Sequence, residues 1–145
     1  MSARSPNVWQ RGFSGGGFSP KLTSTGVGLK ILIVDDNAPV RRLIASIVGP
    51  LAESIQECTS GEEALAAYGS MRPDIVLMDI QMKEMDGIEA TRRICQADRN
   101  AKVVILTDYD DTELRRAAAA AGTIHYALKD NLPDLVRLIG SLRAG

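Results

Sequence analysis

The chain has 145 residues and a formal net charge of −1 at pH 7, and 45% of its residues are hydrophobic and 24% charged. This length predicts one domain with a single core, and the composition is that of an ordinary soluble globular protein. The charge gives no reason to expect a nucleic-acid or anionic-membrane partner, no apolar run approaches the ~20 residues of a membrane span, and two cysteines exclude a disulfide framework.

Residues 1–28 differ in composition from everything that follows. The stretch 11–20 is rich in Gly and Ser and has no apolar period, so we expect residues 1–28 to form a flexible tail. Trp9, Phe13 and Phe18 offer sparse contact points for a partner, and a solvated leader without fixed contacts is the simpler alternative. The tail lacks the apolar core of a secretory signal, so the cytoplasm is the expected compartment.

A regular alternation of strand and helix patterns begins at Leu29. The apolar run 30–34 predicts a buried parallel strand, and a short second strand is expected at 54–58. Between them lies the apolar stripe of an amphipathic helix, which a Gly-Pro pair ends. Its residues are Val40, Leu43, Ile44, Ile47 and Val48. Ser60 then opens a second helix as N-cap, with Glu63 in the capping-box position.

The second half of the chain continues this alternation. Apolar runs at 75–78, 103–106 and 124–128 predict three more buried strands, and helices are expected at 87–96 and 113–121. A last helix has an apolar side made of Leu132, Leu135, Val136, Ile139 and Leu142. Five strands alternating with five helices predict a doubly wound α/β fold, in which a parallel sheet is covered on both faces.

Reactive polar residues stand at the carboxyl ends of four of these strands. Asp35 and Asp36 follow the first strand, Asp79 the third, Thr107 the fourth and Lys129 the fifth. Ligands of open α/β sheets bind beyond the carboxyl ends of the strands. We therefore expect three carboxylates, a hydroxyl and an ammonium group to meet at one edge of the sheet.

This set of groups suits phosphoryl chemistry. Converging carboxylates repel one another unless a cation lies among them, and an all-oxygen site of this kind suits Mg²⁺. An aspartate is a competent nucleophile for forming an aspartyl phosphate, and a lysine and a hydroxyl can contact the phosphoryl oxygens. Taken singly, each residue has a simpler explanation as a turn former, a helix cap or a solvated side chain. Their coincidence at one edge indicates a phosphorylation switch.

From Leu29 to the C-terminus the chain resembles the receiver domain of bacterial two-component response regulators. The resemblance rests on the order and spacing of five motifs across the whole domain. These are Asp35-Asp36, Asp79, the Met85-Asp-Gly87 turn, Thr107 and the run from Tyr126 to Lys129. It implies a receiver domain at 29–145 with a flavodoxin-like sheet in the strand order 2-1-3-4-5.

The resemblance also implies roles for individual residues. Asp79 would accept a phosphoryl group from the histidine of a sensor kinase, as in phosphorelay signal transduction, and Lys129 would contact that group. Mg²⁺ would be bound by Asp36 and Asp79, with Asp35 assisting and the backbone carbonyl of Gln81 completing the protein ligands. The coupled switch pair would be Thr107 and Tyr126. Such a protein is a phosphoacceptor that assists its own phosphorylation and dephosphorylation, and it is not a conventional enzyme.

Departures from the family pattern shape the expected output. Asp130 follows Lys129 where many receivers have proline, a variant similar to receivers that precede a helix-turn-helix DNA-binding domain. Because the chain stops at Gly145, we expect a stand-alone regulator, monomeric or dimerising on phosphorylation, with no direct DNA or membrane binding. It would signal to an unknown protein through the fourth predicted helix, the fifth strand and the fifth helix. Asp108 stands where many members have a small residue, which predicts slow exchange of phosphoryl groups at Asp79.

Two other function classes remain as alternatives at this point. A magnesium-dependent phosphohydrolase would use the same aspartyl nucleophile, but it normally has a second carboxylate two residues later, where this chain has Gln81. A receiver-like docking module would hold its shape without phosphorylation, and the complete acidic set argues against it. A nucleotide-binding fold is weaker still, because the loop after the first strand contains no glycine.

Overall fold

The structure is a computed structural model that describes residues 28–144. The predicted flexible tail, apart from Gly28, lies outside the described residues. No helix within 28–144 combines the length and the apolar character needed to cross a lipid bilayer.

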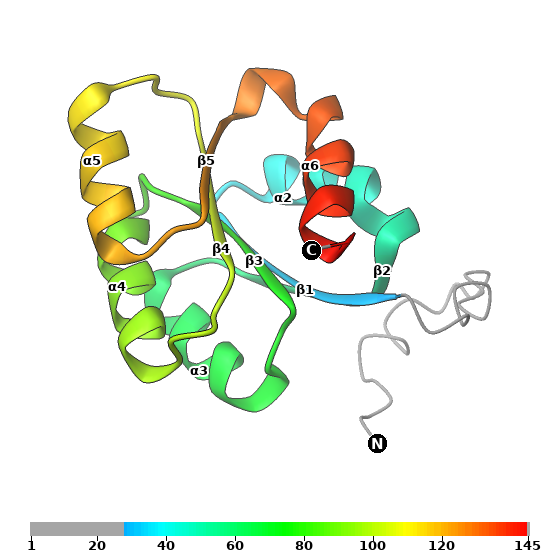
Figure 1. Cartoon of the computed structure of the whole chain (residues 1–145), viewed down its shortest axis with the longest axis horizontal. Helices are drawn as coiled ribbons and strands as arrows, with labels where there is room; N and C mark the ends of the chain where they lie inside the picture. The colour runs from blue at the N-terminus through cyan, green and yellow to red at the C-terminus, as the bar shows by residue number, and fades with distance from the viewer. Residues whose placement is uncertain (1–27, 145) are drawn as a thin grey trace.

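A five-stranded parallel sheet forms the centre of the molecule, and its strand order is β2-β1-β3-β4-β5 (Figure 1). Both the predicted fold class and the predicted strand order are therefore confirmed. The strands are β1 (Leu29–Val34), β2 (Ala52–Cys58), β3 (Ile75–Asp79), β4 (Val103–Thr107) and β5 (His125–Leu128). Because all five strands are parallel, their carboxyl ends share one edge of the sheet.

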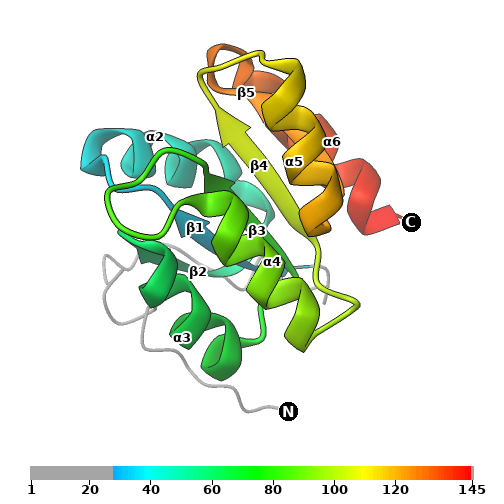
Figure 2. The same ribbon diagram turned by 90° about the vertical axis from the view of Figure 1, so that its left-hand side faces the viewer.

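Helices cover both faces of this sheet, as the alternating pattern predicts. Figure 2 shows α3, α4 and α5 on one face, with α2 and α6 on the other. The helices are α2 (Ala38–Val48), α3 (Gly61–Met71), α4 (Gly87–Ala97), α5 (Thr112–Ala121) and α6 (Pro133–Ala144), and short 3₁₀ turns occupy Gly49–Leu51 and Lys129–Asn131. Each crossover thus carries its helix to one side of the sheet or the other.

The core has two halves, one on each side of the sheet. In β1, Leu32 and Val34 pack with α3, α4 and α5, whereas Ile31 and Ile33 pack with α2 and α6. All four side chains are almost completely buried. The continuous apolar run 31–34 of β1 is therefore explained by burial on both faces of the sheet, not by alternation.

Side-chain caps fix where the helices begin. The oxygen of Asn37 accepts from the Val40 N–H at 3.0 Å, and that of Ser60 accepts from the Glu63 N–H at 3.1 Å. Glu63 reaches back to the N–H of Thr59 at 2.7 Å, one residue before the N-cap, so the predicted capping box forms in a shifted version. Each cap satisfies backbone donors that the first helical turn leaves free.

The structure corrects the predicted apolar faces at two residues. Leu43 in α2 is 50% exposed and Val136 in α6 is 37% exposed. Both lie at the border of an apolar stripe, and the rotation of the helix turns them outward while Ile44 and Ile139 fill the core. Helical spacing alone does not define this rotation.

Strand β5 is less buried than the central strands β3 and β4. Every residue of β3 and β4 is buried, but β5 has an exposed His125 followed by three partly buried residues. It is an edge strand, and the helices on either side cover it incompletely (Figure 1). The sheet is therefore closely packed around β1, β3 and β4 and open along β5.

Candidate functional site

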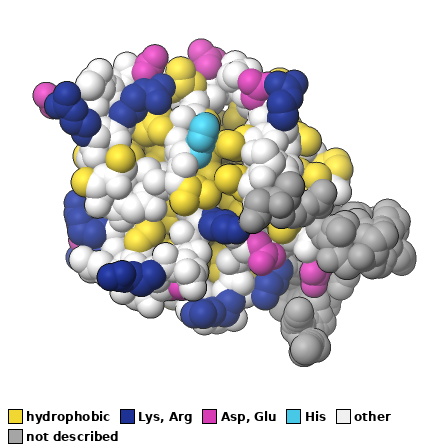
Figure 3. Space-filling view, viewed as in Figure 1, with side chains coloured by type: hydrophobic (Ala, Val, Ile, Leu, Met, Phe, Trp, Pro, Cys, Tyr) yellow, Lys and Arg dark blue, Asp and Glu magenta, His cyan; other side chains and the backbone are white. Residues whose placement is uncertain are grey.

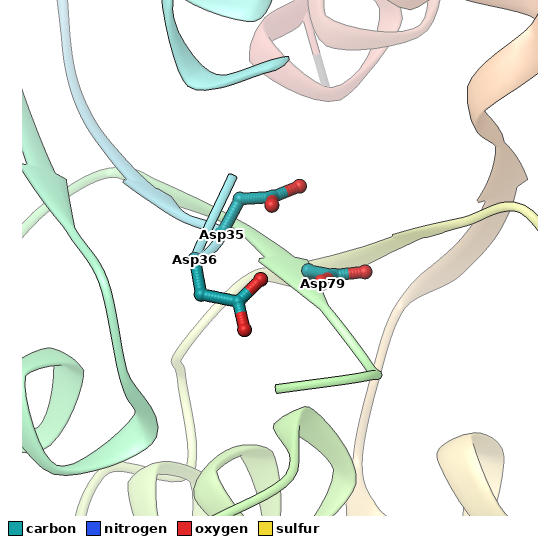
Figure 4. Close-up of side chains that lie close together, drawn as sticks. All are labelled: Asp35, Asp36 and Asp79. Carbon is teal, nitrogen blue, oxygen red and sulfur yellow. The ribbon is translucent and has the colours of Figure 1, made fainter. Parts of the chain in front are cut away.

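Three carboxylates meet at the carboxyl edge of the sheet. Asp35 and Asp36 follow β1, and Asp79 is the last residue of the neighbouring strand β3. Ligand atoms from the three side chains lie within 4.8 Å of one another (Figure 4). Asp35 and Asp79 are buried, with 1% and 6% exposure, whereas Asp36 is exposed. The structure thus brings together the three acidic residues that the sequence singles out.

Lys129, which directly follows the edge strand β5, also reaches this acidic cluster. Its Nζ lies 2.8 Å from Asp35 Oδ2 and 3.1 Å from Asp79 Oδ1. Strand β4 lies between β5 and β3, so the lysine stem crosses one strand to reach the carboxylates. Only 12% of the lysine side chain is exposed, which places the ion pair largely out of water.

Burial and charge set the protonation of the cluster. Burial raises the pKa of Asp79 to about 6; Lys129 opposes this rise and Asp35 adds to it. For Lys129, burial acts to lower the pKa, but the ion pairs with Asp35 and Asp79 outweigh it and the pKa is raised. One ammonium group among three carboxylates leaves an excess of negative charge when all are ionised.

A divalent cation fits this donor set. Although Lys129 Nζ lies at 2.8 Å, Asp35 Oδ2 is buried and accepts no hydrogen bond of good geometry. A buried carboxylate oxygen without a hydrogen-bond donor is a suitable ligand for a hard cation such as Mg²⁺. Two further carboxylates and the excess negative charge favour the same ion.

Residues that the sequence argument missed hold Asp35 in place. The Asn37 N–H donates to Asp35 Oδ1 at 2.9 Å, and Arg41 Nη1 donates to the Asp35 carbonyl at 2.7 Å. Arg41 is itself fixed by an ion pair between its Nε and Glu57 Oε1 at 2.9 Å. The only sequence signal was a basic residue one turn after an N-cap, next to an acidic strand end, and such a residue is usually solvated.

The loop after Asp79 depends on a glycine. The Gly87 N–H donates to the Ile80 carbonyl at 3.0 Å, and a Cβ at position 87 would lie 1.9 Å from the carbonyl oxygen of Asp79. Only glycine allows helix α4 to begin so close to the end of β3. Gln81 lies in this loop with its side chain exposed, and a metal-ligand role for its carbonyl stays a prediction.

The predicted switch residues Thr107 and Tyr126 both form hydrogen bonds with the main chain of one residue, Tyr109. Thr107 is fully buried, and its Oγ1 accepts from the Tyr109 N–H at 3.2 Å. The Tyr126 hydroxyl donates to the Tyr109 carbonyl at 2.6 Å. The Arg115 guanidinium lies 4.5 Å from the centre of the Tyr126 ring, and its Nε pairs with Asp110 Oδ1 at 2.9 Å. Arg115 therefore contacts both the ring of the proposed switch residue and the loop before α5.

Comparisons with known proteins identify the family. The family model of the response regulator receiver domain matches residues 31–140. The chain belongs to this family. The chemotaxis protein CheY of Thermotoga maritima is 35% identical over 111 residues, which cover 76% of this chain and 92% of that protein. The response regulator protein VraR of Staphylococcus aureus is 40% identical over 116 residues, covering 75% of this chain and 55% of that protein.

Several of these relatives are longer than the receiver domain. The chain spans 49% of the transcriptional regulatory protein LiaR of Bacillus subtilis, with 35% identity over 103 residues. The chain therefore spans about half the length of such regulators and nearly the whole length of the chemotaxis relative.

Solved structures support the same assignment. A two-component response regulator of the LuxR family from Aurantimonas superposes with a TM-score of 0.76 at 31% identity, covering 81% of this chain and 86% of that chain. A complex of CheX with CheY, BeF₃ and Mg²⁺ from Borrelia burgdorferi gives a TM-score of 0.76 at 27% identity, covering 83% of this chain and 92% of that chain.

Proposed function

We propose that this receiver domain, residues 29–145, accepts a phosphoryl group on Asp79 from the histidine of a sensor kinase in a Mg²⁺-dependent reaction. The observation that carries the proposal is the convergence of Asp35, Asp36 and Asp79 within 4.8 Å. Lys129 adds a cation at 3.1 Å from the proposed nucleophile. An acceptor, a cation site and a phosphoryl contact are the parts that phosphoryl transfer to a carboxylate needs.

The transfer step uses Asp79 in its ionised form. A carboxylate oxygen forms a bond to phosphorus while the bond from phosphorus to the kinase histidine nitrogen breaks, and the nitrogen keeps the electron pair. Lys129 then exchanges its contact with the Asp79 carboxylate for one with the new phosphoryl oxygens. When bound by Asp36, Asp79, the Gln81 carbonyl and, indirectly, Asp35, Mg²⁺ would neutralise charge on the phosphoryl oxygens.

The proposed switch runs from Thr107 to Tyr126. If the Thr107 hydroxyl turns to donate to a phosphoryl oxygen, it leaves its position as acceptor for the Tyr109 N–H. The Tyr109 carbonyl, which holds the Tyr126 hydroxyl, shifts with it, so the ring of Tyr126 is released to turn inward. Two conformations exist beforehand, and the phosphoryl group favours one of them.

The output in this proposal is protein contact through the face formed by α5, β5 and α6. Tyr126 lies on this face and its environment depends on the switch. Operation as a single domain, as a monomer or as a dimer that phosphorylation promotes, is part of this proposal. The longer relatives make a linked DNA-binding output the alternative to test. A cytoplasmic location agrees with the family.

Phosphorylation is tested by mass spectrometry of the protein incubated with acetyl phosphate and Mg²⁺. We expect one added phosphoryl group on the native chain and none on Asp79→Asn. Asp86→Asn is the matched control, because Asp86 is an exposed N-cap of α4 and asparagine caps a helix equally well. An unlabelled native protein, or equal labelling of Asp79→Asn, would refute the proposal.

A further inference from the structure

A groove of about 520 Å³ runs between β5 and α6. Its apolar part includes Leu106, Ala127 and Leu138. Its charged residues are Asp130 and an ion pair in which Arg137 Nη1 lies 2.9 Å from Asp134 Oδ1. Figure 3 shows hydrophobic side chains gathered in the middle of this face, around the histidine. A contiguous apolar hollow with a charged rim is typical of a binding surface.

The groove exists because the edge strand is poorly covered. All four residues of β5 are exposed or only partly buried, whereas every residue of β4 beside it is buried. Burial of this apolar surface by an occupant contributes about 25 cal/mol of favourable binding free energy for every Å² removed from water. An occupant with apolar side chains would match the floor, and positive charge on it would match Asp130, the lining carboxylate that pairs with no cation within the described residues.

One segment of the chain has this composition. Residues 28–145 contain all 18 acidic residues and 14 of the 17 basic ones, so their net charge is 14 − 18 = −4. Residues 1–27 contain no acidic residue and three basic ones, Arg4, Arg11 and Lys21, which gives +3. The same 27 residues also hold the only Trp and both Phe of the chain. Aromatic side chains with a few cations are suitable anchors for an apolar groove with acidic residues at its rim.

The point of attachment lets this segment reach the groove. The segment joins the sheet at Leu29, at the amino end of β1, and the groove opens at His125, at the amino end of the parallel strand β5. Three strand spacings separate β1 from β5, or about 14 Å. A random-coil chain with as many residues as lie between Phe18 and Leu29 has a root-mean-square span of about 17 Å, which exceeds this separation.

We propose that residues 1–27 of the same chain dock in the groove between β5 and α6, with their aromatic side chains on its apolar floor. Docking does not depend on the proposed phosphoryl transfer. Its consequence for signalling does: because Tyr126 lines the groove, a docked segment covers part of the face proposed for output and competes with a partner there.

Tryptophan fluorescence tests docking directly, because Trp9 is the only tryptophan and lies in the segment itself. In the full-length protein we expect a blue-shifted emission and protection from acrylamide quenching. Leu138→Asp, which charges the groove, should shift the emission to the red and raise the quenching constant severalfold. Val136→Asp is the matched control, because this residue is exposed on the same helix outside the groove lining. Circular dichroism verifies that both variants fold.

A second variant lies in the segment and leaves the folded domain unchanged. Phe13→Ser combined with Phe18→Ser should expose Trp9 as much as Leu138→Asp does. The proposal is overturned if Trp9 of the native chain is already fully exposed, or if Leu138→Asp and the double variant leave its protection intact. It is also overturned if protection disappears on dilution, because the groove would then be filled by the segment of a second copy.

Discussion

The acidic cluster and the surface around Tyr126 lie on the same sheet but are built differently. Asp35 and Asp79 are buried at the ends of central strands. Asp35 accepts from the Asn37 N–H and pairs with Lys129, and Asp79 pairs with the same lysine. Tyr126 belongs to the poorly covered edge strand, and its hydroxyl has one hydrogen bond to a loop carbonyl. Groups that carry chemistry need fixed positions, whereas groups that change conformation need weak competing contacts. The two regions satisfy these opposite requirements.

The energies of the two regions differ in the same sense. Removing one partner from a buried ion pair such as Lys129–Asp35 typically costs about 3–5 kcal/mol. The exposed pair between Arg115 and Asp110 and the cation–π contact with Tyr126 each contribute at most about 1 kcal/mol. Complete switching of a minority state needs roughly 5 kcal/mol of differential binding. The contacts that restrain Tyr126 are therefore the weaker ones, and they are the easier ones to rearrange under the proposed phosphoryl transfer.

The largest effect is expected from a single methyl group at the base of the acidic cluster. Gly87→Ala places its Cβ 1.9 Å from the Asp79 carbonyl, so β3 and α4 must separate, and we expect a loss of about 3 kcal/mol in the free energy of unfolding by urea. Gly140→Ala is the control, since a Cβ there meets no atom within 4 Å and should stabilise α6 by about 0.5–1 kcal/mol. Similar stabilities of the two variants would show that the cluster is less rigid than described.

The next effect follows from the raised pKa of Asp79. Since this pKa rises from 3.8 to about 6 on folding, the native state binds the proton more tightly, and stability from this group is present below pH 4 and lost as the pH rises through 6. At pH 7 without Mg²⁺, the free energy of unfolding of Asp79→Asn should therefore exceed that of the native protein by on the order of 2 kcal/mol. This difference should vanish near pH 4. Urea unfolding of both proteins from pH 4 to pH 7 measures this difference in the free energy of unfolding. Added Mg²⁺ should make the difference smaller at pH 7.

A constant difference between pH 4 and pH 7 would contradict that explanation, because only a group that titrates in this window gives a pH-dependent gap. Glu62→Gln provides the control, since Glu62 lies exposed in the first turn of α3 away from the cluster. This variant measures the effect of removing an exposed carboxylate that lies outside the cluster, and the Asp79→Asn difference is compared with it.

A smaller effect is expected on the Tyr126 surface. Arg115→Ala removes both the contact with the Tyr126 ring and the pair with Asp110, and we expect a stability loss of about 0.5–1 kcal/mol with increased mobility of the ring in NMR spectra. The neighbouring Arg116→Ala is the control and should change neither quantity. If both variants behave alike, Arg115 does not restrain Tyr126.

The smallest expected effect is kinetic. Asp108 is exposed and directly follows Thr107, and we expect its charge to repel an incoming phosphodonor and to obstruct the hydrolytic water. Asp108→Ala should raise the rates of labelling by acetyl phosphate and of dephosphorylation severalfold without changing stability. Unchanged rates would remove Asp108 from the account of exchange at Asp79.

The sequence predicts the acidic cluster well because the geometry of a parallel sheet brings together the residues that follow neighbouring strands. Apolar runs fix where β1 and β3 end, and the residues after them must share an edge, so Asp35 and Asp79 meet with no further information. The same reasoning does not find Arg41 or Tyr109. Their contacts depend on the rotation of α2 and on the path of a loop, which arise from the packing of the whole domain. The exposure of Leu43 and Val136 has the same origin.

The connection between Thr107 and Tyr126 is made only by main-chain atoms of Tyr109, the N–H on one side and the carbonyl on the other. Its half-exposed side chain takes no part. We therefore expect the two hydrogen bonds to tolerate other side chains at position 109 but not proline, because only proline lacks the N–H that donates to Thr107.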